Sequence, residues 1–257
     1  MERLARAWPP VLAFAVVLLV WQGAVWIFRP APFLLPGLDR VGQRLVEFGP
    51  NWPKHVLATV ESILLGFLIA VVFGVAGAVA IVYSETLRRA ITPLLVTLQI
   101  VPKIAFAPLV LVWFGIGLAS KVTIAFLIAF FPVLINTAVG LVQVEPDLLD
   151  LARSIKASPT WVFFKIRFPN SLPYFFAGLR VASTLAVIGA VIGEFVGSDV
   201  GLGYLIVIAN NQLDTPLGIA SIFLVSVIGL VLYGVILAVE RLCTPWVSAE
   251  GGLQALI

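Results

Sequence analysis

Six apolar segments of this sequence are each long enough to cross a lipid bilayer, and they limit the fold more than any other feature. They cover residues 11–28, 56–83, 93–117, 122–144, 172–196 and 217–239. A helix of about 20 apolar residues spans the ~30 Å hydrocarbon core of a membrane. The sequence therefore predicts an all-α, polytopic membrane protein of about six transmembrane helices, with residues 1–257 forming a single domain.

The composition agrees with this class and excludes others. Hydrophobic residues make up 61% of the chain and charged residues 11%, whereas soluble domains carry about 25% charged residues. The single Cys243 excludes an intrachain disulfide, and the single His55 leaves no dense set of metal ligands. We expect His55 to be an interfacial residue. The net charge of +3 is too small to suggest nucleic acid, and we expect no catalytic residues and no metal site.

Three segments outside the main spans have predictable structure. The start, with Arg3 and Arg6 before an apolar run, is typical of a signal peptide. No small-residue cleavage site follows, so we expect a retained first span. The linker at residues 29–54 contains an amphipathic pattern that predicts a short helix on the membrane surface. Residues 205–209 predict a second short surface helix or a segment that dips into the membrane.

Charged residues recur most densely between the fourth and fifth apolar segments, at residues 145–180. Pro146 and Asp147 favour the first turn of a helix, and Ser158 followed by Pro159 predicts the start of a second. Spacings of three and four place one group of apolar residues on a single helix face: Leu148, Leu151, Ala152 and Ile155.

Two proline residues, Pro169 and Pro173, predict the end of the second helix and the entry into the next span. From the residues alone, this stretch is either a docking element for a soluble partner or an amphipathic loop on the lipid headgroups. Helical periodicity within so long a polar loop argues against a simple connector but does not decide between these two interpretations.

The stretch resembles the cytoplasmic EAA loop of binding-protein-dependent ABC importer permeases. The family pattern is Glu-Ala-Ala, three residues, Gly, nine residues, then Ile-x-Leu-Pro. The spacing is matched throughout: Asp150 stands for the acid, Ala152 for the second Ala, Ile166 for the Ile and Pro169 for the Pro. Leu151, Lys156 and Phe168 depart from the first Ala, the Gly and the Leu. Glycine would permit a tight turn or close approach at this position and lysine would not, so we expect Lys156 to alter the docking geometry.

The resemblance extends over residues 59–245. It includes VPKIAFAPLVLVWFGIGLASK before the loop and LPYFFAGLRVASTLAVIGAVIGEFVGSDVGLGYLI after it. These segments are similar to the branch of the family that serves nitrate, sulfonate, taurine and pyrimidine-precursor importers. The resemblance implies the type I ABC importer permease fold, with residues 145–171 as the coupling loop. It assigns coupling to Asp150, Leu151, Ala152, Arg153, Ile155, Lys156 and Ala157.

The same resemblance implies the partners. These are a second copy of the chain, two cytosolic ATPase subunits and an extracytoplasmic substrate-binding protein. The sequence contains no GxxxxGK[ST] loop, so ATP must be handled by another chain. We therefore expect no cofactor on this chain, with ATP and Mg²⁺ on the ATPase, and we do not expect this subunit to be an enzyme.

Three polar residues within the apolar segments are candidates for the translocation path: Lys103, Glu194 and Asn136. A charge inside a membrane span is costly and is by default a functional hypothesis. Lys103 either meets an anionic substrate, pairs with an acid such as Glu194, or extends to the surface from a shifted span. Asn136 is more often an interhelical hydrogen-bonding residue than a substrate contact.

Other features of the spans bear on packing. Pro102 and Pro108 predict interruptions of the third span. Residues Gly189, Gly193 and Gly197 line one face of the fifth, and this face permits close helix approach within the subunit or across a dimer.

The basic residues favour an orientation with both termini in the cytoplasm of a bacterium and the chain in its inner membrane. The inner side then holds Arg3, Arg6, Arg88, Arg89, Arg153, Lys156, Lys165, Arg167, Arg180 and Arg241, and the outer side Arg29, Arg40, Arg44, Lys54 and Lys121.

Two other classes of function remain as alternatives. A self-sufficient secondary transporter or channel would show an internal repeat and a relay of buried charges, neither of which is clear. A membrane-embedded enzyme would need a nucleophile and base, or metal ligands. For the substrate, Lys103 favours an anion such as a sulfonate or nitrate, whereas the sequence from residue 191 to 217 is more similar to permeases for pyrimidine-type precursors.

Overall fold

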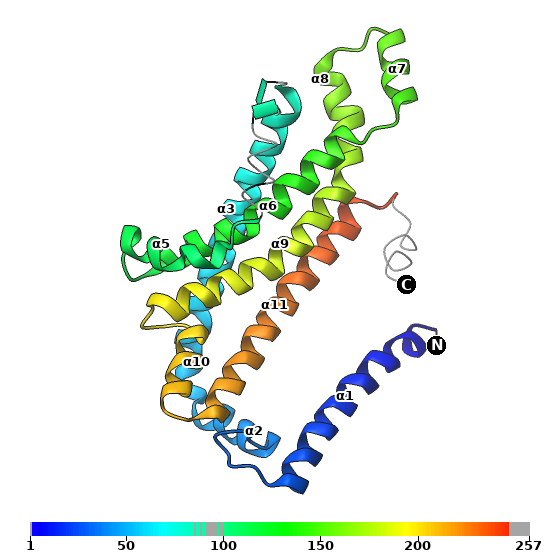
Figure 1. Ribbon diagram of the computed structural model, residues 1–257. Coiled ribbons are helices and arrows are strands. Elements are labelled where there is room, and N and C mark those ends of the chain that lie inside the picture. Colours follow the sequence, from blue (N-terminus) through cyan, green and yellow to red (C-terminus); the bar gives the residue numbers. More distant parts are fainter. Residues whose placement is uncertain (1, 85, 88, 91–96, 98–99, 247–257) are drawn as a thin grey trace.

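A computed structural model describes residues 2–84, 86, 87, 89, 90, 97 and 100–246, and this part of the chain is helical without strands (Figure 1). Its helices are α1 (Glu2–Phe28), α2 (Leu38–Glu47), α3 (Trp52–Tyr83), α5 (Ala107–Phe114), α6 (Leu118–Val142), α7 (Pro146–Ser154), α8 (Pro159–Val162), α9 (Phe168–Gly197), α10 (Leu202–Asn211) and α11 (Thr215–Cys243).

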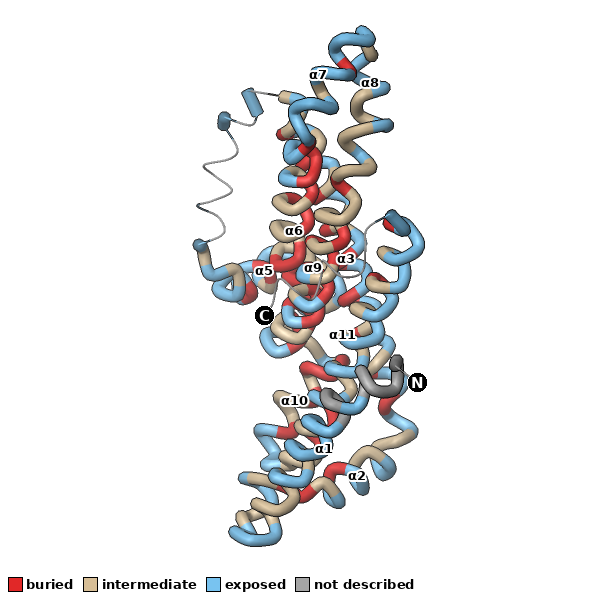
Figure 2. Tube along the Cα trace, turned by 90° about the vertical axis from the view of Figure 1, so that its right-hand side faces the viewer, coloured by how far each residue is buried: buried red, intermediate tan, exposed pale blue. Residues whose placement is uncertain are grey.

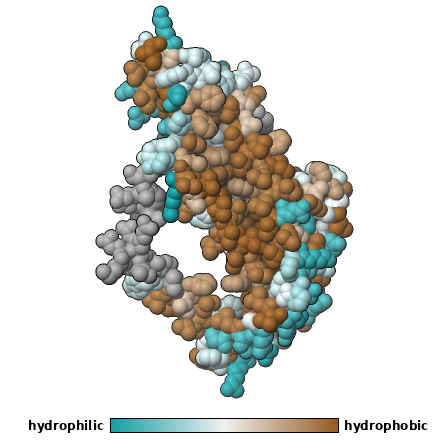
Figure 3. All heavy atoms as spheres, turned by 180° about the vertical axis from the view of Figure 1, so that it is seen from behind, coloured by the Kyte–Doolittle hydropathy of each residue, from teal (hydrophilic) through white to brown (hydrophobic). Residues whose placement is uncertain are grey.

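Four helical stretches of the described chain are long and apolar enough to cross a membrane. They are Gly49–Tyr83, Leu118–Val142, Pro159–Gly197 and Thr215–Cys243. Shorter apolar helices include Leu12–Phe28 and Lys103–Phe114, where the first and third spans were expected. The prediction of an all-α polytopic membrane protein is therefore confirmed. Hydrophobic residues cover the middle of the bundle, as contact with lipid tails requires (Figure 3).

The third expected span is not one continuous helix. Its beginning, at residues 93–96, 98 and 99, lies outside the described residues. Pro102 is extended, with ψ of 94°, and interrupts the helix as predicted. The short helix Lys103–Phe106 then leads into α5, where Pro108 lies in the first turn instead of interrupting a helix. Proline is tolerated there because first-turn N–H groups have no intrahelical partner.

The centre of the bundle is α6, which packs between α3 and α9. A Cβ atom added to Gly66 of α3 would lie 2.5 Å from Ala125 Cβ, and one added to Gly189 of α9 would lie 2.7 Å from Ala125 Cα. Only glycine fits at these crossings. The glycine face of the fifth span therefore serves helix packing within the subunit, which was the first of the two alternatives, rather than packing across a dimer. Buried positions follow α6 and α9, whereas α1 and α7 are mostly exposed (Figure 2).

The second helix of the polar loop does not end at Pro169, so that prediction is wrong. A π-helical turn, Phe163–Arg167, joins α8 to α9, and together they form one helix of 39 residues. In this turn the N–H of Phe168 bonds to the carbonyl of Phe163, five residues back. The wider turn comes directly before Pro169 and Pro173 and keeps the helix continuous through both prolines.

The two ends of the bundle differ. Helices α2 and α10 lie at one end and α7 at the other (Figure 1). Helix α1 lies apart from the bundle and is tied to it near α2. Two hydrogen bonds make this connection: Trp21 Nε1 donates to the Pro36 carbonyl at 3.1 Å, and the N–H of Leu38 donates to Gln22 Oε1 at 2.8 Å.

Candidate functional site

The start of α10 is held by three side chains from two other helices. The N–H of Gly201 donates to His55 Nδ1 at 3.1 Å, and that of Leu202 to Thr59 Oγ1 at 2.8 Å. The N–H of Gly203 donates to Glu194 Oε2 at 2.7 Å. The first N–H groups of any helix lack intrahelical partners. Here His55 and Thr59 of α3 and Glu194 of α9 supply those partners within the buried interior.

Glu194 is 1% exposed, and both of its carboxylate oxygens accept hydrogen bonds. Besides the Gly203 amide, Thr59 Oγ1 donates to Oε1 at 2.8 Å. The carboxylate also lies at the positive end of the α10 dipole, which favours a negative charge. The structure therefore places Glu194 in a helix-capping network, while Lys103 lies at a different site, beside Phe131.

Two glycines leave the space that the Glu194 side chain needs in this network. A Cβ atom on Gly201, whose φ is +133°, would overlap the carboxyl group of Glu194. A Cβ atom on Gly203 would lie 2.8 Å from Glu194 Cβ. We call the set His55, Thr59, Glu194, Gly201 and Gly203 the α10 clamp.

Two residues at or beside the clamp are buried within the chain. His55, which was expected to be an interfacial residue, lies in the first turn of α3, and its ring stacks on Tyr204 with centroids 6.2 Å apart. Lys121, which was expected on the outer side of the membrane, is 3% exposed in the first turn of α6. Lys121 Nζ donates to Ser198 Oγ at 3.3 Å and to the Val200 carbonyl at 3.4 Å, and so fixes the segment between α9 and α10.

The coupling loop contains the two predicted helix starts. Pro146 lies in the first turn of α7. Ser158 caps α8, because its Oγ accepts from the N–H of Trp161 at 3.2 Å. Asp150 and Arg153 form an exposed ion pair with each other on α7. Ala152 is buried, but the rest of the predicted apolar face is exposed: Leu148 by 44%, Leu151 by 60% and Ile155 by 60%.

Lys156 ends α7 in the conformation that glycine prefers. Its φ is +53°, in the left-handed region. The N–H of Ala157 bonds to the Ala152 carbonyl at 2.9 Å, and that of Lys156 to the Arg153 carbonyl at 3.0 Å. These two bonds define a Schellman helix end. The expectation that lysine would not make the tight turn is therefore wrong, although a side chain in this region costs about 1–2 kcal/mol.

The base of the loop is attached to the end of α6. Arg167 Nη1 donates to the Leu141 carbonyl at 2.8 Å. Asn170 Nδ2 donates to the carbonyls of Gly140 at 3.0 Å and Gln143 at 2.8 Å. These side chains satisfy carbonyls that a helix end leaves unpaired, and the positive charge suits the negative end of the helix. Sequence reasoning missed both residues, since nothing in the spacing indicates their partners.

Lys103 and Asn136 line one pocket of about 310 Å³, which we call the lysine pocket. The Lys103 ammonium lies 4.7 Å from the centroid of the Phe131 ring, within the range of a cation–π contact. Asn136 Nδ2 donates to the Pro132 carbonyl of its own helix at 2.8 Å, in place of the expected interhelical bond. The other lining residues are apolar: Ile128, Phe131, Pro132, Ile135, Val181 and Leu185. The structure thus brings together two of the three path candidates and leaves Glu194 in the α10 clamp.

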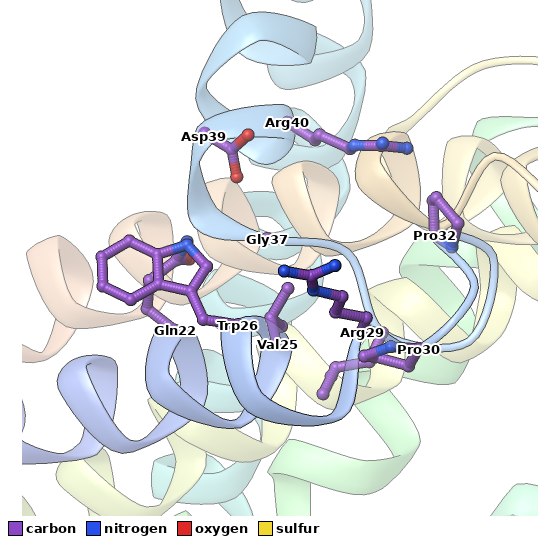
Figure 4. A pocket seen from close by; sticks show the side chains of 10 residues that line it. Gln22, Val25, Trp26, Arg29, Pro30, Pro32, Gly37, Asp39 and Arg40 are labelled. Atoms are coloured by element: carbon purple, nitrogen blue, oxygen red, sulfur yellow. The ribbon is translucent and has the colours of Figure 1, made fainter.

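A polar pocket of about 340 Å³ lies where α1 meets α2. Arg29, at the end of α1, and Arg40, on α2, lie on opposite sides of it (Figure 4). Next to this pocket, Arg44 of α2 forms an ion pair with Asp214, which lies at the start of α11. The Arg44 Nη2 and Asp214 Oδ2 atoms are 2.6 Å apart. The hydrogen bond that Arg44 donates to Asp214 raises the pKa of Arg44 above its ordinary value. This end of the molecule therefore presents a structured surface that carries both basic and acidic side chains.

These features define a helical membrane protein with a helix exposed beyond one end of its bundle. Residues 62–245 match the family described as binding-protein-dependent transport system inner membrane component, and the chain belongs to this family.

Two relatives and one solved structure agree with this assignment. The chain is 33% identical to the formylaminopyrimidine transport permease protein ThiX of Halalkalibacterium halodurans, over 96% of this chain and 98% of ThiX. It is 29% identical to the taurine transport system permease protein TauC of Escherichia coli, over 95% of this chain and 94% of TauC. Its fold is similar to that of a chain of the inward-facing MetNI methionine ABC transporter, with a TM-score of 0.62 at 17% identity, over 74% of this chain and 94% of that chain.

The protein is therefore the membrane-spanning permease subunit of an ABC importer for small solutes, in the nitrate, sulfonate and taurine branch. It is a multi-pass protein of a bacterial membrane. The family match favours an importer permease over a secondary transporter or a membrane-embedded enzyme.

The α10 clamp yields a test of stability. Thr59→Val removes the hydroxyl that accepts a hydrogen bond from the Leu202 N–H and donates one to Glu194 Oε1, so both groups lose this partner. Each buried group left unpaired costs about 1–3 kcal/mol. We expect a clear fall in the unfolding temperature of the purified chain in mild detergent. Thr123→Val is the matched control, because Thr123 is only partly buried and its hydroxyl bonds within its own helix, to the Ala119 carbonyl. Equal unfolding temperatures for the two variants would contradict the clamp.

The end of α7 yields a second test. Lys156→Gly removes the side chain from a left-handed residue and should stabilise the helix end by about 1 kcal/mol. Hydrogen–deuterium exchange of the peptide covering residues 150–158 should slow by about fivefold. Lys156→Ala keeps a Cβ atom and should give no such gain. If both variants slowed exchange equally, the effect would come from the lost charge and not from the backbone.

Proposed function

We propose that the exposed helix α7 is the docking element for a cytosolic ATPase, and that ATP and Mg²⁺ bind to that ATPase and not to this chain. The observation that carries the proposal is the distance of α7 from the membrane. The continuous helix Pro159–Gly197 has 39 residues and is roughly 58 Å long. The hydrocarbon core is only ~30 Å thick. Since α10 and the clamp lie at the far end of this helix, α7 projects well beyond the headgroups.

The chemistry of α7 suits a protein groove. Leu148 and Leu151 of α7 and Ile155 at its end are apolar and exposed, at the end of the molecule opposite α2 and α10 (Figure 1). An amphipathic helix with apolar residues at these spacings is a common mode of helix-in-groove recognition. The exposed Asp150 and Arg153 pair flanks this face and supplies charge for the rim of an interface. Ala152, Lys156 and Ala157 form the end of α7, and they are the remaining residues proposed to serve coupling.

We propose that two copies of the chain form the transport unit. Helix α1 supports this proposal because large apolar side chains on it are exposed, including Leu19 by 70%, Val20 by 66% and Trp26 by 71%. A second copy packed against α1 would cover this surface. The basic residues Lys165 and Arg167 near α7 fit a cytoplasmic location for this end, with both chain termini on the same side. The α2 and α10 end then faces an extracytoplasmic substrate-binding protein.

The translocation path is proposed to pass the lysine pocket. Its ammonium and amide groups are polar contacts in an otherwise apolar lining, and the pocket volume suits a small solute. The positive charge of Lys103 favours a solute with an anionic group. The name of the relative TauC specifies taurine, and taurine carries a sulfonate group. Glu194 lies toward the outer end of α9, where it is proposed to limit the path through its hold on α10.

The docking proposal is tested by exchanging charges on α7. Asp150→Arg and Arg153→Asp, made singly and together, are compared by the amount of ATPase that co-purifies with a tagged chain from its native membrane. The double variant restores an ion pair within α7 but presents reversed charges to a partner. We expect all three variants to lose the ATPase.

If the double variant recovered the ATPase, the two residues would serve only each other. Transport that continued without any ATPase would contradict the importer assignment itself.

The path proposal is tested separately with Lys103. Lys103→Gln should lower ATP-driven uptake of an anionic solute by at least tenfold while leaving ATPase co-purification unchanged. Lys103→Arg keeps the charge and should retain more uptake. Asn136→Ala should give a smaller loss, because the pocket keeps its ammonium group. Uptake of the anion at the original rate in Lys103→Gln would remove the lysine pocket from the path.

A further inference from the structure

A second pocket, of about 310 Å³, lies between α3, α6 and the start of α9. We call it the aromatic pocket. It is separate from the lysine pocket, and its lining is almost wholly apolar. Phe163 and Phe164 come from the π-helical turn, Phe168 and Phe175 from α9, and Val79 from α3. Its volume is at the lower end of the range for ligand sites.

One polar atom in this lining has no visible role in the fold. Thr137 of α6 is 4% exposed and lines the pocket. Among the residues that the structure describes, its Oγ1 has no hydrogen-bond partner. A buried hydroxyl without a partner costs about 1–3 kcal/mol. An apolar pocket with one unsatisfied hydroxyl is suited to an apolar ligand that carries a single hydrogen-bond acceptor.

The position of Thr137 along α6 indicates the source of such a ligand. Helix α6 has 25 residues and is about 37 Å long, a few ångströms beyond the ~30 Å core at each end. Thr137 lies five residues before its end at Val142, about 7–8 Å along the axis. With α6 centred on the core and along the membrane normal, the hydroxyl would lie just inside the hydrocarbon boundary, at the level where acyl chains meet their ester groups.

Positive charge lies beside the aromatic pocket. Leu141 lines it, and the Leu141 carbonyl accepts from the guanidinium of Arg167. Lys165 is exposed on the same π-helical turn as Phe163 and Phe164. A phosphate at the headgroup level is the anion that a membrane supplies here.

We propose that the aromatic pocket holds an acyl chain of a membrane glycerophospholipid, with the ester carbonyl accepting a hydrogen bond from Thr137. The lipid binds between two packed helices, α3 and α6, and the π-helical turn that leads into the coupling loop. Wider helical turns of this kind often occur at functional sites. The bound lipid thus fills the joint between the membrane bundle and the helix that carries α7.

The test uses the full chain, purified in mild detergent and stripped of lipid. Native mass spectrometry measures binding of a diester phosphatidylglycerol and of its diether analogue, which lacks the carbonyl oxygens. The wild-type chain should bind one diester molecule about threefold to tenfold more tightly than the diether. Thr137→Val should bind both lipids equally, with the affinity that the wild type has for the diether.

A second pair of variants tests the place of binding. Val79→Trp fills the pocket and should abolish the tight site for both lipids. Val72→Trp is the control on the same helix, because Val72 is 65% exposed and lies outside the lining. Equal binding by these two variants, or no ester preference in the wild type, would overturn the proposal. A change of oligomeric mass in Val79→Trp, with lipid binding unchanged, would overturn it in favour of a contact between copies of the chain.

Discussion

The contact between the Glu194 carboxylate and the first turn of α10 is the constraint on which the outer end of the structure depends. Burying a carboxylate costs several kcal/mol unless hydrogen bonds and favourable charges replace its water. Here Thr59, the Gly203 amide and the α10 dipole provide that replacement. The arrangement in turn satisfies the N–H groups of α10, which would otherwise be buried without partners. Helices α3, α9 and α10 are therefore joined at one point.

The two ends of the long helix Pro159–Gly197 have opposite properties. At one end, Glu194 and the α10 clamp are buried and fully hydrogen-bonded. At the other, α7 is exposed and carries an uncovered apolar face, and the base of the loop is attached to the end of α6 through Arg167 and Asn170. One continuous helix connects these regions.

The sequence predicted those parts of the fold that depend on local pattern. Lengths of apolar runs predicted the main spans, Pro146 and Ser158 predicted the starts of α7 and α8, and the glycine spacing on α9 predicted a close packing face. These features are encoded within one helix or one turn, so no knowledge of distant residues is needed.

The site depended on contacts that the sequence does not reveal. Thr59 and Glu194 are 135 residues apart, and the partners of His55 and Lys121 lie in the segment between α9 and α10. Burial of these residues follows from helix packing and not from their neighbours in the chain. Lys156 was misjudged because two backbone hydrogen bonds outweigh the cost of its left-handed conformation. Two of the three path candidates, Lys103 and Asn136, line the lysine pocket together. Contact between either residue and a solute stays a prediction.

The measurement that tests this account most directly is hydrogen–deuterium exchange of the wild-type chain in lipid nanodiscs, resolved at Gly201, Leu202 and Gly203. First-turn amides of a helix normally exchange fast, because they lack intrahelical partners. The account predicts that these three amides exchange at least tenfold more slowly than those in the first turn of α7, which has no side-chain cap. Equal rates in the two turns would show that His55, Thr59 and Glu194 do not hold α10, and would contradict the central claim.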